Sequence, residues 1–402
     1  MKWPGWRCGR FSVITRIDLR HFKCFERLKL PLRRLTLLSG LNASGKSSVL
    51  QAIVLLHQTM REHEWSQRLM LNGAALCLGA VRDVIDQISG GREFSLALED
   101  DEAGLIEWEF RGEQGAMSMA VLRVQAPAHN DAQWRTEHSQ PLQHLLPEAV
   151  ANSPAGGSLA RRLRGLSWLA AERLGPRDIY PLEDPELTPV VGESGEHAAS
   201  VLYSGADERV AIPLLVAGTP PTLLRQVEAR MGEFFPGFGM DLSPVAHVNA
   251  VTLGVRTSRD TQFHRPGHTG FGITQVLPII VAILSAKRDD LLLIENPEVH
   301  LHPGGQARMG KLLAQAAGAG VQVMIESHSD HILNGIRRAV RDGVLEASDA
   351  ALYFFRPRHE AEASGAAQIE SPSIDAEGGI DNWPAGFFDQ IDHDMQYLAG
   401  WS

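Results

Sequence analysis

A glycine-rich segment that carries one lysine and several serines has the residue types and spacing to bind phosphate. Glycines let successive backbone N–H groups curl around phosphate oxygens. Lys46 would reach the β- and γ-phosphates of a nucleotide, and the Ser47 hydroxyl would ligate Mg²⁺. An apolar strand-like run precedes the segment, and apolar residues at helical spacing follow it. The sequence therefore predicts a P-loop, formed by Gly40, Leu41, Asn42, Ala43, Ser44, Gly45, Lys46, Ser47 and Ser48.

A P-loop needs a carboxylate at the end of a neighbouring buried strand, where it holds Mg²⁺ through water. Glu295 follows the continuous apolar run 291–294 and is the natural candidate. The next apolar run, 321–325, is followed by Glu326, Ser327 and His328, whose imidazole is a second phosphate-facing group. Gly270, Gly272, Thr274 and Gln275 open a helix whose N-terminus favours phosphate through its backbone N–H groups and dipole.

The elements that must position these residues alternate strand, helix and strand in the C-terminal third, as in a parallel sheet. Residues 14–20 alternate apolar and polar and predict a half-exposed first strand. Runs at 94–98, 106–110 and 119–124 predict an antiparallel side sheet, and residues 125–165 an insertion with a short helix near 142–150. The fold class is α/β, with a mixed or parallel core sheet, the antiparallel side sheet and a helical insertion.

The chain has 402 residues, 44% of them hydrophobic, and a formal net charge of −10. It lacks an apolar run long enough to span a bilayer and lacks a signal-peptide pattern, so we expect a cytoplasmic protein with no membrane partner. Its cysteines, three in number, do not suggest a disulfide framework or a cysteine zinc site. A local basic excess between Lys2 and Arg34 makes DNA a candidate partner, and a solvated strand edge would look the same.

The motifs, in their order, resemble the ABC-type AAA ATPases of the chromosome-maintenance (SMC), RecF-like and OLD-like group, and within it a bacterial set of predicted ATPases. The resemblance covers nearly the whole chain. It is carried by IDLRHFK from Ile17, GLNASGKSS from Gly40, AERLGPR from Ala171, GFGITQVLP from Gly270, IENPEVHLHP from Ile294, ESHSDHILNGIR from Glu326 and WPAGFFD from Trp383.

The resemblance implies one ABC-type head over residues 1–402 that dimerises around two ATP molecules. Each ATP would lie between the P-loop of one subunit and the helix start at 270–275 of the other. We expect an N-terminal lobe over 14–124, an inserted or lid region over 125–260, a third lobe over 261–356 and a tail over 357–402. The chain is too short for coiled-coil arms or an appended nuclease, so an effector protein is the expected partner.

Two departures from the group's pattern affect catalysis. Asn296 stands where a second acidic residue usually polarises the attacking water, and an amide cannot take a proton. Glu298 or His328 with a bound water would then be the base, or hydrolysis is slow. Gly270 stands where the group has a serine, although Thr269 or Thr274 could supply a hydroxyl.

The sequence thus predicts an ATPase with ATP and Mg²⁺ as cofactors that drives or gates a partner in DNA repair or anti-phage defence. The alternative is a nucleotide-dependent assembly switch with little turnover. Arg173 and Arg177 either contact phosphate or brace a turn, and the glycine-rich residues 192–197 predict a surface turn. Predicted catalytic residues are Glu295, Glu298 and His328, the predicted metal ligands are Ser47 and Glu295, and Arg173 joins the nucleotide-binding set.

Overall fold

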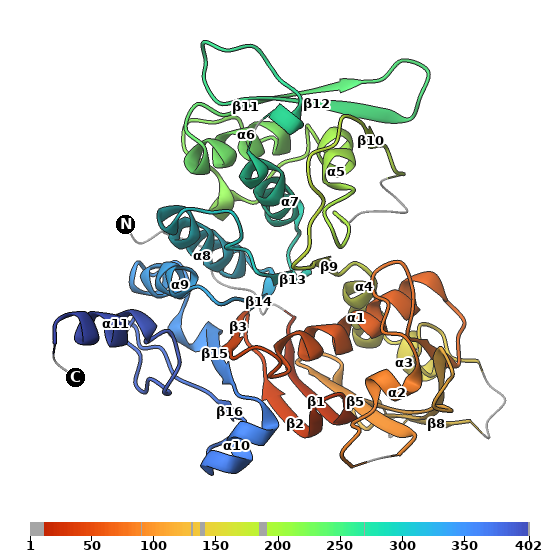
Figure 1. Cartoon of the computed structure of the whole chain (residues 1–402). Helices are drawn as coiled ribbons and strands as arrows, with labels where there is room; N and C mark the ends of the chain where they lie inside the picture. Colours follow the sequence, from red (N-terminus) through yellow and green to blue (C-terminus); the bar gives the residue numbers. More distant parts are fainter. Residues whose placement is uncertain are drawn as a thin grey trace. The chain divides into compact units, whose positions relative to one another are not determined.

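The chain folds into two compact units in the computed structural model (Figure 1). The structure describes residues 12–89, 91–129, 132–136, 141–184, 191–268 and 270–400. Unit 1 comprises Met1–Leu166 and Ala351–Pro372, and unit 2 comprises Ser167–Ala350 and Ser373–Ser402. Residues 125–166, part of the inserted region expected from the sequence, belong to unit 1, and the expected lobes of the head stay a prediction. The α/β class is confirmed.

Unit 1 contains an antiparallel sheet with the order β2-β1-β5-β6-β7-β4, in which β8 also pairs with β7. The predicted side sheet is confirmed in β5, β6 and β7, and the first strand, β1, joins this same sheet through β5. Its strands are β1 (Ile14–Phe22), β2 (Phe25–Pro31), β4 (Arg68–Met70), β5 (Glu93–Asp100), β6 (Gly104–Arg111), β7 (Ser118–Ala126) and β8 (Ala132–Arg135).

Unit 1 also holds β3 (Leu35–Gly40), which is buried throughout, and α1 (Lys46–Glu62) directly after the P-loop. β15 (Ala350–Phe355) pairs antiparallel with β16 (Ile369–Glu370). The single helix expected near 142–150 is instead a pair that begins later, because prolines sit at the start of each helix, where they are tolerated. The helices besides α1 are α2 (Val81–Val84), α3 (Glu148–Ala151), α4 (Pro154–Arg164) and α10 (Arg358–Ser364).

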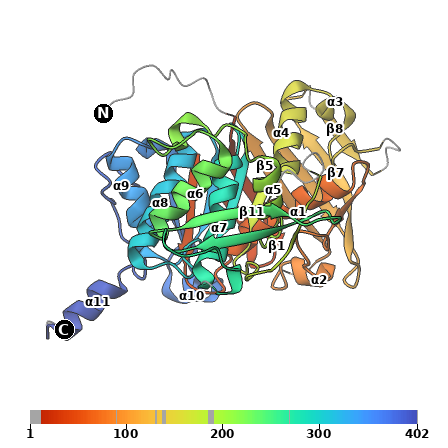
Figure 2. The same cartoon turned by 90° about the horizontal axis from the view of Figure 1, so that it is seen from above.

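Unit 2 contains three parallel strands in the order β9-β13-β14, as the alternation of strands and helices predicts. They are β9 (Ser167–Leu169), β13 (Leu291–Glu295) and β14 (Gln322–Glu326). The last two are buried on both faces. Figures 1 and 2 show α8 (Pro303–Gly318) and α9 (Asp330–Arg341), which follow these strands, side by side.

A second, antiparallel sheet in unit 2 has the order β10-β12-β11. Figure 1 shows it beside α5, α6 and α7. These elements are β10 (Tyr180–Pro181), β11 (Gly239–Pro244), β12 (Ala250–Arg256), α5 (Ala198–Ser204), α6 (Leu223–Phe234), α7 (Phe271–Ser285) and α11 (Gln390–Leu398). In the part of the chain that the structure describes, no helix has the length and apolarity to cross a membrane.

Candidate functional site: a P-loop and a strand-end carboxylate cluster

The P-loop of unit 1 lies between the buried strand β3 and the first turn of α1, the arrangement that its sequence predicts. Gly45 is the N-cap of α1 and has a φ of 101°, so its backbone lies in the left-handed region that favours glycine. Ala43 also has a positive φ, of 57°. The chain therefore turns sharply before α1, and the backbone N–H groups of the first helical turn have no intrahelical acceptor, which suits them to bind an anion.

Packing around the P-loop explains two of its glycines. A Cβ on Gly40 would lie 2.1 Å from the carbonyl oxygen of Phe355, and one on Gly45 would lie 2.5 Å from Cys24 Sγ and from the Phe25 ring. Distances below 3.0 Å are essentially never seen for real Cβ atoms. The turn between β1 and β2 thus lies directly against the P-loop, and only glycine fits at these two positions.

The Lys46 side chain lies over the P-loop. Its Nζ donates hydrogen bonds to the carbonyl oxygens of Gly40, at 3.1 Å, and Leu41, at 2.7 Å. The Ser44 hydroxyl donates to the same Leu41 oxygen at 2.7 Å, which closes the loop. Ser47 and Ser48 are half-buried at the start of α1. A lysine at the first position of a helix that follows a glycine-rich turn is an arrangement suited to the terminal phosphates of a nucleotide.

In unit 2, Glu295 ends β13 and is buried, with 8% of its surface exposed. Trp168 Nε1 donates to Glu295 Oε1 at 3.2 Å. Glu326 ends the neighbouring strand β14 directly opposite Glu295 in the parallel register. Burial raises the pKa of Glu295 to about 7, and the nearby Glu326 carboxylate contributes to this rise. A divalent cation would relieve this carboxylate repulsion. Among the described residues no group of three or more acidic, histidine or cysteine side chains is placed to hold a metal, so a magnesium ion at Glu295 stays a prediction.

Arg173 is a buried brace behind this strand end. Its Nη2 donates to the carbonyl oxygens of Glu295 and Asn296. Burial lowers the pKa of Arg173 to about 10, so the guanidinium stays charged at neutral pH. Among the described residues its Nε and Nη1 atoms have no hydrogen-bond partner. Of the two sequence interpretations, the structure shows Arg173 bracing the chain, while contact with phosphate stays a prediction.

The segment after β13 holds Asn296 and Glu298 in different roles. Asn296 has a φ of 45°, a left-handed conformation that asparagine tolerates, and its N–H donates to the Glu326 carbonyl at 2.8 Å. Glu298 accepts hydrogen bonds from the Ser327 hydroxyl and from the His328 N–H, both at 2.9 Å. Both carboxylate oxygens of Glu298 thus hold the segment that carries the exposed His328. A role of Glu298 or His328 as the base stays a prediction.

The helix predicted to start near Gly270 is observed as α7, while the role of its N-terminus toward phosphate stays a prediction. Gly270 precedes the helix, and Phe271 is exposed at its first position, with Gly272 half-buried beside it. The Thr274 hydroxyl donates to the Phe271 carbonyl at 3.0 Å, inside its own helix. Thr269, the other candidate hydroxyl, lies outside the described residues. Gln275 is buried, and its Nε2 donates to the carbonyl oxygens of Arg173 and Leu174, both at 3.3 Å.

Sequence reasoning missed two features of this carboxylate cluster. Trp168 reaches Glu295 because β9 pairs with β13, and no motif pointed to this tryptophan. Residues 192–197, interpreted from the sequence as a surface turn, form a half-buried turn that packs against β9 and α7, with Gly195 buried. Their carbonyl groups accept from the N–H groups of Ala170 and Leu174, and a Cβ on Gly195 would lie 2.5 Å from Pro278 of α7. Neither contact could be predicted, because β9 is short and the residues in contact are far apart in the sequence.

The structure therefore brings the predicted residues together in two sets. The P-loop residues gather in unit 1. In unit 2, Glu295, Glu298 and Arg173 lie within one hydrogen-bonded cluster. Gln275 connects this cluster to α7, and Ser327 connects it to the segment that leads into α9.

Two family models match different parts of the chain. Residues 13–149 and 266–333, just over half of the chain, match a family model described as an AAA ATPase domain. Residues 345–398 match a family described as a protein of unknown function (DUF3696). None of the curated proteins compared with the chain matches it.

Among solved structures, the chain is similar to an Smc head bound to the C-winged helix domain of ScpA. The sequence identity is 13%, the match covers 90% of this chain and 98% of that one, and the TM-score is 0.51. A Pyrococcus furiosus structure of an Smc head with the C-terminal domain of ScpA has 10% identity, 97% and 99% coverage and a TM-score of 0.47. The Thermotoga maritima SMC head has 11% identity, 89% and 98% coverage and a TM-score of 0.41. The first likeness shows the shared fold.

Proposed function

Because the chain belongs to the AAA ATPase domain family, we propose that it binds Mg–ATP, hydrolyses it slowly and assembles around the nucleotide to drive or gate a partner protein. The observation that carries the proposal is the P-loop, in which Lys46 lies over the loop at the start of α1. The Smc-head fold supports it. The proposed location is the cytoplasm, where ATP is available as the substrate.

Each residue has a defined role in this proposal. Lys46 and the α1 N–H groups hold the β- and γ-phosphates, with Gly40, Asn42, Ala43, Ser44, Gly45 and Ser48 shaping the loop. Ser47 of unit 1 would ligate Mg²⁺, and Glu295 of unit 2 is the carboxylate that would hold the ion through water; Mg²⁺ would neutralise charge on the phosphates. In the assembled dimer, the α7 N-terminus of one subunit faces the nucleotide of the other through Gly270 and Gly272.

Phosphate release from ATP tests the proposal, together with the mass of the protein in solution with and without ATP. We expect slow release in the wild type that is lost in Lys46→Ala, and a mass increase with ATP that is lost in the same variant. Arg34→Ala, which changes a cation outside the P-loop, is the matched control and should behave like the wild type. Release that persists in Lys46→Ala would rule out the P-loop as the site.

An assembly switch without turnover is the second candidate, and two observations favour it. Asn296 cannot accept a proton, and both oxygens of Glu298 are engaged by Ser327 and His328. In that case ATP raises the mass but releases no phosphate. Glu298→Gln separates the roles: unchanged turnover in this variant excludes Glu298 as the base, whereas loss of turnover with retained ATP binding supports it.

The process driven is proposed to be DNA maintenance or defence against phage, with an effector protein as partner and DNA as a further one. The support is the shared fold with an Smc head that is itself bound to a ScpA domain. Stimulation of phosphate release by duplex DNA would favour the first role. A purified effector that is active with the ATP-bound wild-type protein and inactive with the Lys46→Ala variant would favour the role in defence.

A further inference from the structure

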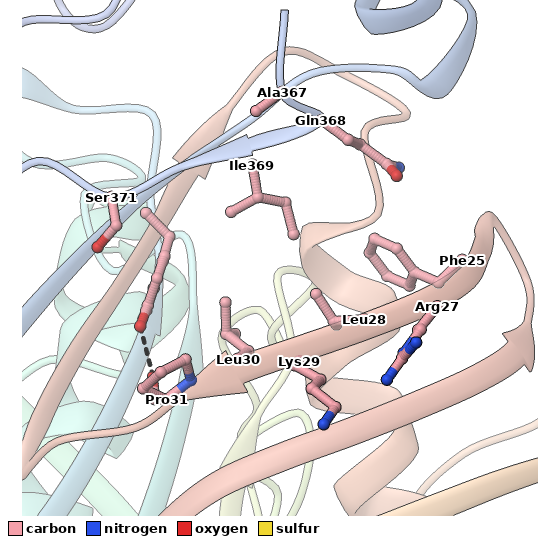
Figure 3. A pocket seen from close by; sticks show the side chains of 11 residues that line it. Phe25, Arg27, Leu28, Lys29, Leu30, Pro31, Ala367, Gln368, Ile369 and Ser371 are labelled. Atoms are coloured by element: carbon pink, nitrogen blue, oxygen red, sulfur yellow. Dashed lines mark hydrogen bonds between the residues drawn. The ribbon is translucent and has the colours of Figure 1, made fainter.

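A groove in unit 1 lies between two strands, β2 and β16, each at the end of its strand order (Figure 3). It encloses a cavity of about 430 Å³. Side chains of β2 form one wall, and Ala367, Gln368 and Ile369 form the other, as Figure 3 shows. A second cavity of about 420 Å³ continues from it toward α10 and shares Arg27 and Gln368 with the first.

The free edge of β2 turns its main-chain polar groups toward this groove. Leu32 N–H donates to the Thr15 carbonyl of β1, so the main-chain N–H and C=O groups of the even-numbered residues point toward β1. The main-chain groups of residues 27, 29 and 31 therefore point away from β1. The carbonyl of Pro31 accepts from the Tyr353 hydroxyl at 2.6 Å (Figure 3, dashed line), which confirms this direction. The N–H and C=O groups of Arg27 and Lys29 are left to pair with another extended chain.

The same two residues carry charge that no ion pair within the described residues balances, since Asp18, which lies opposite Lys29 on β1, is paired with Arg16. Arg27 and Lys29 are exposed, and within the described residues neither makes an ion pair or side-chain hydrogen bond. The residues that line the cavity of Figure 3 include no aspartate or glutamate. The carboxylates that line the second cavity, Glu26 and Glu362, are already paired with Arg358.

Gln368 supplies an independent observation, a side-chain donor without a hydrogen-bond acceptor in the described part of the chain. Its side-chain Nε2 is buried and has no hydrogen-bond partner among the described residues, although the side chain lines both cavities. A buried amide donor without an acceptor costs about 1–3 kcal/mol, so such groups are normally paired. Because this atom is buried, a carbonyl or carboxylate oxygen placed in the groove would accept from it after rotation of the Gln368 side chain.

We propose that this groove binds an extended peptide segment of a partner protein, in which acidic and apolar residues alternate, as an added strand on β2. Arg27 and Lys29 are two residues apart and share one face of β2, so acidic residues two apart on the incoming strand meet both. Leu28 and Leu30 share the opposite face, where the alternate apolar residues lie. Main-chain pairing gives affinity and the alternation gives specificity.

The charges also exclude other occupants. A second copy of this chain that paired β2 with β2 would place cations opposite cations, and Pro31 would remove a donor from the pair. Cationic side chains and proline on an edge are a common protection against such pairing. Duplex DNA would engage Arg27 and Lys29 but would leave the edge N–H and C=O groups of β2 unused. The observations thus favour an acidic strand.

The binding test uses purified full-length protein and a fluorescent synthetic peptide in which Glu and Val alternate, followed by anisotropy. A Lys–Val peptide and a peptide with the same Glu and Val content in two blocks are the peptide controls. We expect binding of the alternating acidic peptide alone. N-methylation of one alternate set of its amides should abolish binding and methylation of the other set should not, because only one edge of the peptide can pair with β2.

The protein variants are Arg27→Glu/Lys29→Glu and, as a control with the same change in net charge, Arg82→Glu/Arg92→Glu at exposed positions of the same unit. We expect affinity to fall about tenfold or more in the first and to stay at the wild-type value in the second. Arg27→Lys/Lys29→Arg should retain binding. An unchanged thermal midpoint shows that each variant is folded.

Three outcomes would overturn the proposal. These are equal binding of the peptide by both charge-reversed variants, indifference to both methylation sets, and duplex DNA binding that depends on Arg27 and Lys29 while the acidic peptide fails to bind. The last outcome would identify a nucleic-acid surface. The test does not need ATP, so a failed ATPase assay leaves it valid.

Discussion

At the scale of single residues, the strand-end cluster of unit 2 depends on buried polar groups that hold main-chain atoms in place. Arg173 donates to two carbonyl oxygens on either side of the β13 terminus, and Gln275 in turn donates to the Arg173 carbonyl. Glu298 holds the Ser327–His328 segment in a similar way. The position of the Glu295 carboxylate is therefore set by groups that do not themselves need to touch a nucleotide.

Arg173→Met removes the donor to Glu295 and Asn296 while keeping an apolar side chain of similar length. We expect the free energy of unfolding to fall by about 2 kcal/mol, because two buried carbonyl oxygens lose a charged donor. Arg177→Met, at an exposed position four residues on, should change it by less than about 0.5 kcal/mol. Urea denaturation compares the two. Similar values for both variants would show that Arg173 is not a brace.

His57 of α1 gives unit 1 a defined pH dependence. It is buried and its Nδ1 hydrogen-bonds the Leu163 carbonyl at 2.7 Å, so the ring donates from Nδ1 when it is neutral. Burial lowers the pKa of His57 from 6.5 to about 4. Between these two pH values the unfolded chain therefore binds a proton that the folded chain does not, and stability falls as the pH falls.

His57→Gln removes this titration and keeps an amide that can donate to Leu163. Relative to the variant, the wild type should lose up to about 3 kcal/mol of its free energy of unfolding as the pH falls from about 7 to about 4. Chemical denaturation at several pH values measures the difference. Parallel curves for the two proteins would mean that His57 is not the titrating group.

At the scale of elements, the crossing of α8 and α9 shows how close packing fixes the strand ends of unit 2. A Cβ on Gly310 would lie 2.2 Å from the Ile332 carbonyl oxygen, and one on Gly335 would lie 2.2 Å from the Ala307 carbonyl oxygen. Each helix thus presents a glycine to the backbone of the other. Since α9 starts directly after the His328 segment, this contact limits how that segment can move.

Gly310→Ala should lower the free energy of unfolding by about 1–3 kcal/mol, because the added methyl group must push two backbones apart. Gly232→Ala is the matched control. A Cβ on this glycine of α6 would meet nothing within 4 Å, so alanine should stabilise by about 0.5–1 kcal/mol through helix propensity. Thermal melts of the two variants should shift in opposite directions. A shared direction would contradict the close crossing.

At the scale of the whole molecule, the chain leaves unit 2 at residue 350, contributes 351–372 to unit 1 and returns to unit 2 with its tail. Within unit 2, the tail is held on α9: Arg337 Nε donates to the Gly378 carbonyl at 2.7 Å, and its guanidinium lies 5.6 Å from the centre of the Trp383 ring. Phe387 is fully buried and its ring contacts those of Trp383 and Phe388. The Arg337 contacts thus hold the tail on α9, and the aromatic contacts pack the residues of the tail against one another.

Phe387→Ala should cost about 3–5 kcal/mol, as deletion of a buried aromatic side chain does. Trp383→Ala should cost less, because 44% of that residue stays exposed. Limited proteolysis after Pro372 is the second measurement, and the tail should be released faster in Phe387→Ala than in Trp383→Ala. The reverse order would show that the exposed tryptophan, and not Phe387, seats the tail.

Features that depend on local spacing could be predicted from the amino-acid sequence alone. The P-loop, its preceding strand and the periodicity of α1 are contiguous, so backbone geometry and helix period are enough to predict them. The buried apolar runs of β13 and β14 and the Ser329 cap of α9 follow from the same kind of pattern. For this reason the α/β class and the order of the C-terminal elements were open to prediction.

Contacts across long separations emerge only from the folded chain. Trp168 and Arg173 lie more than a hundred residues before Glu295 in the chain, and only the β9–β13 pairing brings them to it. The membership of β1 and β2 in the antiparallel sheet, and the free edge at Arg27 and Lys29, likewise depend on strand pairing. Strand pairing depends on packing over the whole unit, so a local pattern of residues does not predict it.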